Sequence, residues 1–370
     1  MILTLHEISQ HFFFTGNVEE IHPVGEGLIN DTFLVKTSGN TPNYILQRKN
    51  RHIFTNVPAM MNNIHKVTSH LKKKVAENGG NPDREALTVI PARDGKLYYR
   101  DKEGEFWAAC LFIEDTVSYD AARDPELARQ GGKGIGHFQR LLVDMPGTLE
   151  DTLPGFHDMR FRFQQWDEAL ARDPAGRKNM VKKEIEWIEE RREEMLTFKN
   201  KFETGEIPTR VTHNDTKISN ILFNRDGEIL CVIDLDTVLS SSCLNDYGDA
   251  IRSYANTGLE DDKDLYRVTL DTGIFEAYTR GYLSEAIDFL TPPERENLAF
   301  SARYITFEQV LRFLMDYIEG DTYYKIKYTE HNLTRARAQY KLLHSMEERY
   351  EDTRDIVERV TREQELIQTR

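Results

Sequence analysis

The sequence predicts an α+β protein with a small β-rich N-terminal part and a larger, mainly helical C-terminal part. Three observations support this fold class. The chain has 370 residues, more than one ordinary hydrophobic core needs, so two domains are expected. Short segments with alternating apolar and polar residues occupy the first 115 residues, whereas apolar residues recur at helical spacing from residue 125 onward. The predicted domains are therefore residues 1–115 and 116–370.

Strands around one helix are expected in the N-terminal part. "GLINDTFLVKT" (27–37) alternates in polarity, and "NYILQRK" (43–49) follows a Gly-Asn-Thr-Pro turn, so these two segments are expected to pair. A helix is expected after Pro58, because apolar residues recur there every three or four positions. Three further strands are expected within residues 86–101 and 105–115.

Helices dominate the C-terminal part. Apolar residues at helical spacing predict helices over residues 125–143 and 178–202 and a long charged helix near 333–365. Between them, two short apolar segments at 220–224 and 229–235 flank an Arg-Asp-Gly turn and predict a β-hairpin.

Two segments imitate functional motifs. "GGKGIG" (131–136) lacks the Lys-Ser/Thr ending of a phosphate-binding loop and lies within a helical pattern. Small residues for close helix packing explain it better. "SSSCLND" (240–246) contains a cysteine with no histidine and orienting partner around it, so it is interpreted as a polar loop and not as a nucleophile site.

Composition excludes several classes of function. The net charge is −14, from 62 acidic and 48 basic residues, which disfavours nucleic acid and anionic membranes as partners. The longest apolar run, "WAACLFI" (107–113), is too short to span a bilayer. The three cysteines show no metal-binding spacing, and no basic segment precedes the apolar residues at the N-terminus, so a cytoplasmic location is expected.

A cluster of polar residues in "VTHNDTKISN" (211–220) carries the strongest functional pattern. Its spacing is H-x-D-x-x-x-x-N, formed by His213, Asp215 and Asn220, and Asp234 follows at the end of the next apolar strand. Phosphoryl transfer from a nucleotide needs one carboxylate to orient a hydroxyl, and amide and carboxylate oxygens to hold Mg²⁺. Asp and Asn are also common in turns without any catalytic role, because their side chains hydrogen-bond the nearby backbone. The additional Asp234 at the end of a second apolar strand makes a chance occurrence of the pattern a weaker explanation. His213 is expected to brace the loop.

Glycines near the N-terminus fit the same chemistry. Gly25 and Gly27 in "GEGLIND" stand at a turn between two expected strands, where backbone amides can approach phosphate oxygens. A basic residue at the end of the following strand would reach the phosphates, and Arg48 is preferred over Lys49 for this contact.

These motifs resemble a known family. "VTHNDTKISNILF…CVIDLDTV" is similar to the catalytic core of the aminoglycoside phosphotransferase and choline kinase group, which has the bilobal protein-kinase-like fold. "GEGLINDTFLV", "YILQRKNRHIFTNVPAMMNNI", "TLPGFHDMRFRF" and "RFLMDYIEGDTYYK" resemble the N-acetylhexosamine 1-kinases, which phosphorylate the anomeric hydroxyl of N-acetylglucosamine or N-acetylgalactosamine. The resemblance covers about residues 20–345.

The resemblance implies a role for each motif. Asp215 would be the catalytic base, and Asn220 and Asp234 would bind Mg²⁺. The residues expected to hold ATP are Gly25, Gly27, Asn30, Arg48, Glu114 and Thr116. The residues expected to contact the sugar are His157, Asp158, Arg312, Asp316 and Tyr317, although Arg312 and Asp316 are equally well explained as an i,i+4 pair on a buried helix.

The resemblance implies an ATP- and Mg²⁺-dependent sugar 1-kinase with a small-molecule acceptor. Alternatives are the same chemistry on an aminoglycoside, choline, homoserine or another sugar, and a nucleotide-binding pseudokinase without catalysis. The chain departs from the protein-kinase pattern at one point, the helix after the strand 43–49. In protein kinases, a glutamate on this helix pairs with the strand lysine. Here the first glutamate is Glu77, so another acid, an Asn such as Asn62, or no residue would orient Arg48. The sequence leaves the oligomeric state open.

Overall fold

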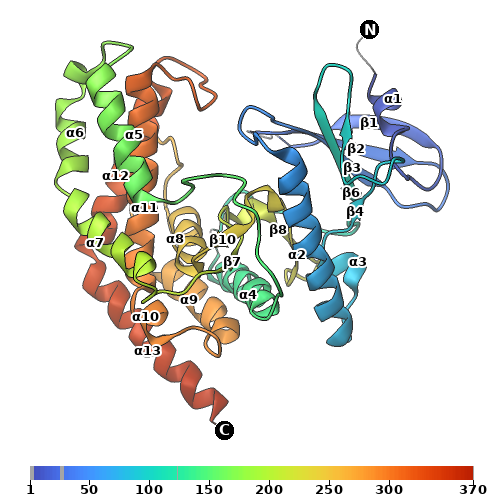
Figure 1. Ribbon diagram of the computed structural model, residues 1–370. Helices are drawn as coiled ribbons and strands as arrows, with labels where there is room; N and C mark the ends of the chain where they lie inside the picture. The colour runs from blue at the N-terminus through green and yellow to red at the C-terminus, as the bar shows by residue number, and fades with distance from the viewer. Residues whose placement is uncertain (1–3, 26–28, 123, 370) are drawn as a thin grey trace. The chain divides into compact units, whose positions relative to one another are not determined.

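The computed structural model describes residues 4–25, 29–122 and 124–369 (Figure 1). The chain forms two compact units. The first contains Met1–Ser118, Leu141–Leu153 and Ile221–Ser240, and the second contains Tyr119–Arg140, Pro154–Asn220 and Ser241–Arg370. The chain therefore returns to the first unit twice, whereas the sequence predicted one break between residues 115 and 116.

An antiparallel sheet forms the centre of the first unit. Its strands follow the order β1-β2-β3-β6-β4, and β5 pairs with β6. The strands are β1 Val18–Pro23, β2 Asp31–Thr37, β3 Tyr44–Lys49, β4 Val89–Ile90, β5 Tyr99–Arg100 and β6 Phe106–Leu111. The expected pairing of the segments 27–37 and 43–49 corresponds to β2 and β3, with Asp31 opposite Arg48. Strand β1 is not among the strands that the sequence predicts.

The pleat of β3 gives its last two residues opposite environments, because successive side chains of a strand point to opposite faces. One face carries Tyr44 and Leu46, which are buried in a cluster with residues of β2, β6 and the segment around α1 (Leu5–Ser9). Arg48 belongs to this face at the exposed end of the strand. The other face carries Ile45, Gln47 and Lys49, and there Lys49 is buried.

A helix and a hairpin complete the first unit. Asn56 is the N-cap of helix α2 (Val57–Glu77), because its side chain accepts a hydrogen bond from the Ala59 amide. A proline occupies the first turn of the helix. The short helix η3 (Leu235–Thr237) packs against α2. Strands β8 (Ile221–Phe223) and β9 (Ile229–Val232) form the expected hairpin. Because Phe223 pairs with Val117 and β9 packs against α3 (Pro82–Glu85), the hairpin belongs to the first unit.

The second unit is mainly helical. Its helices are α4 Pro125–Leu142, α5 Met159–Arg172, α6 Lys182–Glu189, α7 Arg192–Glu203, α8 Cys243–Tyr254, α9 Thr272–Ala286, α10 Pro292–Glu296, α11 Leu298–Glu319, α12 His331–Glu348 and α13 Tyr350–Gln368. Shorter elements are η1 Lys178–Met180, β7 Arg210–Thr212, η2 Ile218–Asn220 and η4 Leu265–Arg267, and β10 (Leu239–Ser241) lies at the boundary where the chain leaves the first unit. Helix α11 is buried on nearly all sides, against α5, α8, α12 and other helices, and forms the core. Among the described residues, no helix is both long and apolar enough to cross a membrane.

The glycines of "GGKGIG" lie within α4, as the sequence predicted, and bring it against α9. A Cβ atom on Gly132 would lie 2.2 Å from the backbone oxygen of Tyr278, and one on Gly136 would lie 2.6 Å from that of Tyr282. Gly281 of α9 faces α4 in the same way, since its Cβ would lie 1.8 Å from the backbone oxygen of Arg129. The backbones therefore approach more closely than any residue with a side chain allows.

Three expected elements differ from the structure. The single helix over 178–202 is η1, α6 and α7, because the chain turns at residues 190–191 before α7 begins. The helix near 333–365 is divided between α12 and α13 at Arg349. "SSSCLND" is not a loop throughout: Ser242 caps α8, which begins at Cys243. The apolar residues that define α8 continue at helical spacing after residue 246, where this segment ends.

The contact between α4 and α9 predicts a large effect of one methyl group. Gly132→Ala is expected to lower the free energy of unfolding by about 1–3 kcal/mol, because the methyl group meets backbone atoms that cannot rotate away. Gly273→Ala in α9 is the matched control, since its Cβ would meet only the Asp271 carboxylate, at 3.2 Å. The measurement is the midpoint of urea unfolding. A Gly132→Ala protein as stable as the wild type would contradict the close packing described here.

Candidate active site

The loop between β7 and η2 fixes the position of Asp215. The backbone amide of Asp215 donates to Nδ1 of His213 at 3.2 Å, which matches the bracing role expected for that histidine. One carboxylate oxygen, Oδ2, accepts from Nδ2 of Asn220 at 3.0 Å and forms an ion pair with Lys217 at 3.0 Å. The Asp215 side chain is 29% exposed. The contacts of the described residues thus hold Oδ2 and leave Oδ1 open as an acceptor.

Two buried carboxylates of α8 hold this loop. Asp246 accepts from the backbone amides of His213 at 3.0 Å and of Asn214 at 2.6 Å, each with a different oxygen. Asp249, one helical turn later, accepts from the backbone amide of Thr216 at 2.9 Å. Three loop amides, on both sides of Asp215, are therefore fixed on one helix.

Burial and charge shift the pKa values of these two carboxylates in opposite directions. Burial raises the pKa of Asp246, although the nearby His213 and the loop amides oppose the shift. Burial also acts to raise the pKa of Asp249, but the Arg252 guanidinium, bonded at 2.9 Å, outweighs it and holds the pKa below its usual value. The sequence analysis named neither residue, although "NDYGD" places both acids on one face of a helix.

Asn220 and Asp234 have the oxygen chemistry that Mg²⁺ prefers. Both amide hydrogens of Asn220 point to Asp215, one to its backbone oxygen at 2.8 Å and one to its carboxylate, which turns the amide oxygen away from Asp215. Asp234 follows β9 in the left-handed conformation, with φ 60° and ψ 60°, which is uncommon outside glycine and frequent at functional sites.

The two side chains supply one amide oxygen and one carboxylate. Within the described part of the chain, no group of three or more His, Cys, Asp or Glu side chains is arranged to hold a metal. Mg²⁺ is commonly held by one or two carboxylates together with substrate phosphates and water. The donor chemistry of the Asn220 amide oxygen and of the Asp234 carboxylate fits this ion.

A buried ion pair lies at the end of β3. The ammonium group of Lys49 lies 2.7 Å from Oδ1 and 2.9 Å from Oδ2 of Asp236, and the two side chains are 3% and 6% exposed. Lys49 also donates to Oε1 of Gln47 at 2.7 Å. Asn30 donates to Oδ2 of Asp236 at 2.7 Å and accepts from the backbone amide of Asn50 at 3.1 Å. The side chains of Asn30, Gln47, Lys49 and Asp236 are thus joined by hydrogen bonds, and Gln47 extends the network to Thr32 on β2.

Arg48 has a different environment from Lys49. It pairs with Asp31, the residue opposite it on β2, and the two side chains are 48% and 44% exposed. Its guanidinium also lies 6.0 Å from the centre of the Trp107 ring. An acid thus does orient Arg48, but it comes from the neighbouring strand and not from α2, and Asn62 is not involved.

The other residues expected to hold the nucleotide lie in the first unit. Gly25 has a φ of 72°, in the left-handed region, and Gly27 lies outside the described residues. The side chain of Glu114 accepts from Asn43 at 2.8 Å and its backbone oxygen accepts from Arg84 at 3.0 Å. The Thr116 hydroxyl donates to the backbone oxygen of Ile113 at 3.0 Å.

His157 links the catalytic loop to α11. Its Nδ1 lies 2.6 Å from a carboxylate oxygen of Glu308, and its Nε2 lies 3.3 Å from the backbone oxygen of Asn214, next to Asp215. Glu308 is fully buried and also accepts from Arg162 at 3.1 Å. Burial acts to raise the pKa of Glu308, but His157 and Arg162 outweigh it and hold this pKa far below its usual value.

Arg312 lies beside this pair with aromatic rings around it. Its guanidinium carbon lies 5.5–5.7 Å from the ring centres of Phe156, Tyr323 and Tyr324. Asp158, by contrast, caps α5 by accepting from the amides of Arg160 and Phe161.

Asp316 and Tyr317 make contacts that hold the C-terminal end of α11. The Asp316 carboxylate accepts from the backbone amides of residues 322, 323 and 324 and from Asn332, so both oxygens are occupied within the protein. No ion pair between Arg312 and Asp316 is found among the described residues. Tyr317 is buried, and the Arg177 guanidinium lies 4.6 Å from its ring centre.

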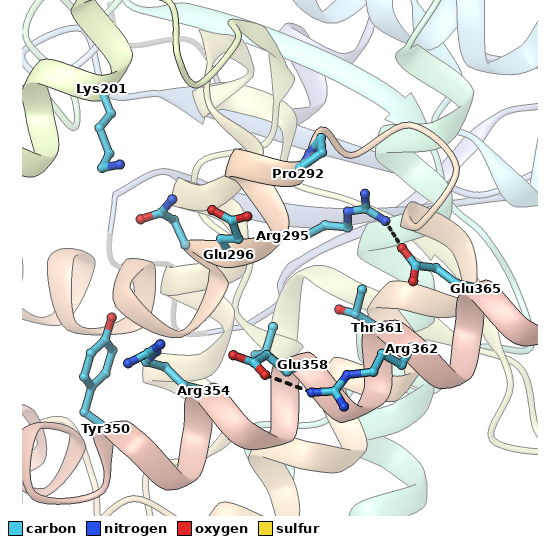
Figure 2. A pocket seen from close by; sticks show the side chains of 12 residues that line it. Lys201, Pro292, Arg295, Glu296, Tyr350, Arg354, Glu358, Thr361, Arg362 and Glu365 are labelled. Atoms are coloured by element: carbon cyan, nitrogen blue, oxygen red, sulfur yellow. Dashed lines mark hydrogen bonds and ion pairs between the residues drawn. The ribbon is translucent and has the colours of Figure 1, made fainter.

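A separate cavity of about 580 Å³ lies between α10 and α13 (Figure 2). Two ion pairs lie within its lining: Arg295 pairs with Glu365, and Arg362 pairs with Glu358. None of the residues expected to bind substrate lines it.

Comparison with solved structures identifies the fold. An aminoglycoside phosphotransferase from Alicyclobacillus acidocaldarius superposes with a TM-score of 0.59 at 12% identity, covering 95% of this chain and 98% of that one. A microcompartment-associated aminopropanol kinase gives 0.59 at 14% identity, with 94% and 97% covered. A choline kinase from Cryptosporidium parvum gives 0.54 at 15% identity, with 90% of each chain covered. These similarities confirm the predicted α+β, protein-kinase-like fold class.

A family model provides the assignment that the solved structures alone do not. The model described as the phosphotransferase enzyme family (APH) matches residues 20–293, which include the β-sheet, the loop with Asp215 and the hairpin that precedes Asp234. The chain is therefore a member of the phosphotransferase enzyme family.

Proposed function

We propose that the protein is an ATP-dependent small-molecule kinase whose acceptor is the anomeric hydroxyl of N-acetylglucosamine or N-acetylgalactosamine. Family membership supports phosphoryl transfer, and the geometry of Asp215 carries the assignment of its catalytic group. Its backbone is fixed through His213, and Asn220 and Lys217 hold one carboxylate oxygen, so the other can accept the proton of a hydroxyl.

The remaining roles follow from the chemistry of each group. Asn220 and Asp234 would hold Mg²⁺, which neutralises charge on the nucleotide phosphates when bound. Gly25, Asn30 and the segment with Glu114 and Thr116 are proposed to lie along the nucleotide. For the basic residue that reaches the phosphates, the burial of Lys49 favours it over the half-exposed Arg48, because a charge held away from water acts more strongly on a phosphate.

Charge near the catalytic loop favours a neutral acceptor. His157 contacts the backbone oxygen of Asn214, and Arg312 lies near His157. The Glu308 carboxylate pairs with His157 and Arg162 and also attracts the Arg312 charge, so three basic groups share one buried acid. A cationic acceptor such as choline or an aminoglycoside would meet this positive charge. A sugar could instead accept hydrogen bonds from Arg312 and pack on Tyr323, which is 52% exposed.

The first prediction concerns the acceptor. ADP release with MgATP is expected with N-acetylglucosamine and N-acetylgalactosamine, and is expected to be much slower with glucose, galactose, kanamycin, choline, homoserine and aminopropanol. A coupled assay of ADP formation measures this. Turnover confined to a cationic acceptor would keep the phosphotransferase and overturn the sugar assignment, and binding of ATP without turnover on any acceptor would point to a pseudokinase.

The second prediction concerns the base. Asp215→Asn is expected to lower kcat by about 10²–10⁴-fold, because the amide cannot accept the hydroxyl proton, while the KM for MgATP changes little. Asp226→Asn, in the exposed turn of the β8–β9 hairpin, is the matched control and should keep wild-type kcat. Near-normal turnover of Asp215→Asn would remove Asp215 from this role.

The third prediction concerns the metal. Asp234→Asn retains a residue that tolerates the left-handed conformation but removes the charge. It is expected to weaken Mg²⁺-dependent ATP binding by at least about tenfold, which corresponds to about 1.4 kcal/mol. Calorimetric titration of ATP at several Mg²⁺ concentrations measures this. Unchanged dependence on Mg²⁺ would exclude Asp234 as a ligand.

A further inference from the structure

The pairing of Lys49 raises a question that the sequence left open. In protein kinases the strand lysine that contacts the phosphates pairs with a glutamate on the following helix. The corresponding helix here, α2, has no acidic residue before Glu77, its last residue. The carboxylate that meets Lys49 instead belongs to Asp236 in η3, the short helix that packs against α2.

The contacts of Asp236 are those of a positioning group. Oδ1 accepts from Lys49, and Oδ2 accepts from both Lys49 and Asn30, at distances of 2.7–2.9 Å. Gln47, on the same face of β3, accepts a further bond from the ammonium group. Three acceptor contacts from two side chains therefore fix the end of a long, flexible lysine, and they leave neither oxygen of Asp236 free of protein contacts.

We propose that Asp236 positions Lys49 for the nucleotide phosphates and thereby replaces the helix glutamate of protein kinases. This inference rests on the proposed function. The second acid of "DLD" thus differs in role from the first: Asp234 is the ligand for the metal, and Asp236 orients a cation of the protein. A lysine is a compact charge on four flexible carbons, so its position relative to a phosphate depends on such a partner.

Asn30 connects the same carboxylate to the backbone at the end of β3. Its side chain bridges Oδ2 of Asp236 and the backbone amide of Asn50, the residue after β3. Asn30 also follows the glycine-containing segment that is proposed to cover the phosphates. Asp236 therefore fixes both Lys49 and Asn30, and loss of its charge should disturb ATP binding as well as transfer.

The test compares Asp236→Asn with Lys49→Met. Both are expected to lower kcat with MgATP and the best acceptor by about 10²–10³-fold, as for other preorganised electrostatic groups. The double variant is expected to be no slower than the slower single variant, because residues that act as a unit are not additive. Lys36→Met, on the neighbouring strand β2 in an exposed pair with Glu20, is the matched control and should keep kcat within a few-fold.

Two further readouts separate positioning from other roles. Urea unfolding, recorded for each variant, identifies the conditions in which it is folded, and kinetics are compared there, so a purely structural role would leave kcat per folded molecule at the wild-type value. The dependence on Mg²⁺ is expected to stay normal in Asp236→Asn and to change in Asp234→Asn. If Asp236→Asn does not fold, Asn30→Ala takes its place, with an expected rise in the KM for ATP and an unchanged Mg²⁺ dependence.

The outcomes distinguish the inference from the function on which it rests. A wild-type protein that neither binds MgATP nor releases ADP overturns the proposed function. A wild-type kinase in which Lys49→Met is slow and Asp236→Asn is normal overturns the positioning role alone. A shift in Mg²⁺ dependence in Asp236→Asn that matches Asp234→Asn would make Asp236 a metal ligand and would also overturn it.

Discussion

The buried carboxylate of Asp246 is the constraint on which the catalytic loop depends. A charge removed from water must be met by hydrogen-bond donors, and here the donors are the His213 and Asn214 amides and the side chain of Gln139. Tyr282 in turn donates to Gln139 at 2.7 Å. Loop, α4, α8 and α9 are thereby connected by one set of bonds. The loop conformation is therefore a requirement of the helical core, which explains how Asp215 can be held in a segment without regular secondary structure.

In the first unit, the buried charge that needs hydrogen-bond partners is positive. Lys49 is buried, so the protein must provide a carboxylate and further acceptors, and it provides Asp236 and Gln47. Asn30 then saturates the carboxylate. In both units, buried partners fix the chain segment or the side chain that the chemistry of phosphoryl transfer would use: Asp246 holds the loop with Asp215, and Asp236 holds Lys49.

Local patterns in the sequence predicted most of the strands and helices and the residues of the central motif. The H-x-D-x-x-x-x-N spacing and the hairpin after it are short-range features, so composition and periodicity were sufficient to find them. The helices at 178–202 and 333–365 were predicted as continuous because charged residues sustain a helical pattern across the turns at residues 190–191 and Arg349. The β1 strand was missed because half-buried residues give it no clear alternation.

The partners of the site residues were not predictable in the same way, because they lie far away along the chain. Asp246 is 32 residues from Asn214, and Asp236 is 187 residues from Lys49. The contacts of Asp316 with the loop after α11 and of Glu308 with His157 likewise depend on tertiary packing. Sequence spacing suggested an Arg312–Asp316 pair on one helix, but the stronger demand of the unpaired loop amides takes the Asp316 carboxylate.

The alternation at the end of β3 has a consequence for comparing this chain with distant relatives. Arg48 and Lys49 are neighbours in sequence and similar in charge, yet one faces solvent beside Asp31 and the other faces Asp236. Shifting an alignment by one position in this strand would match a relative's basic residue to the solvated Arg48 in place of the buried Lys49, or the reverse. Both alignments would pair one basic residue with another and so would score similarly. At identities of 12–15%, the burial pattern of the strand and not the identity of the basic residue should decide which positions correspond.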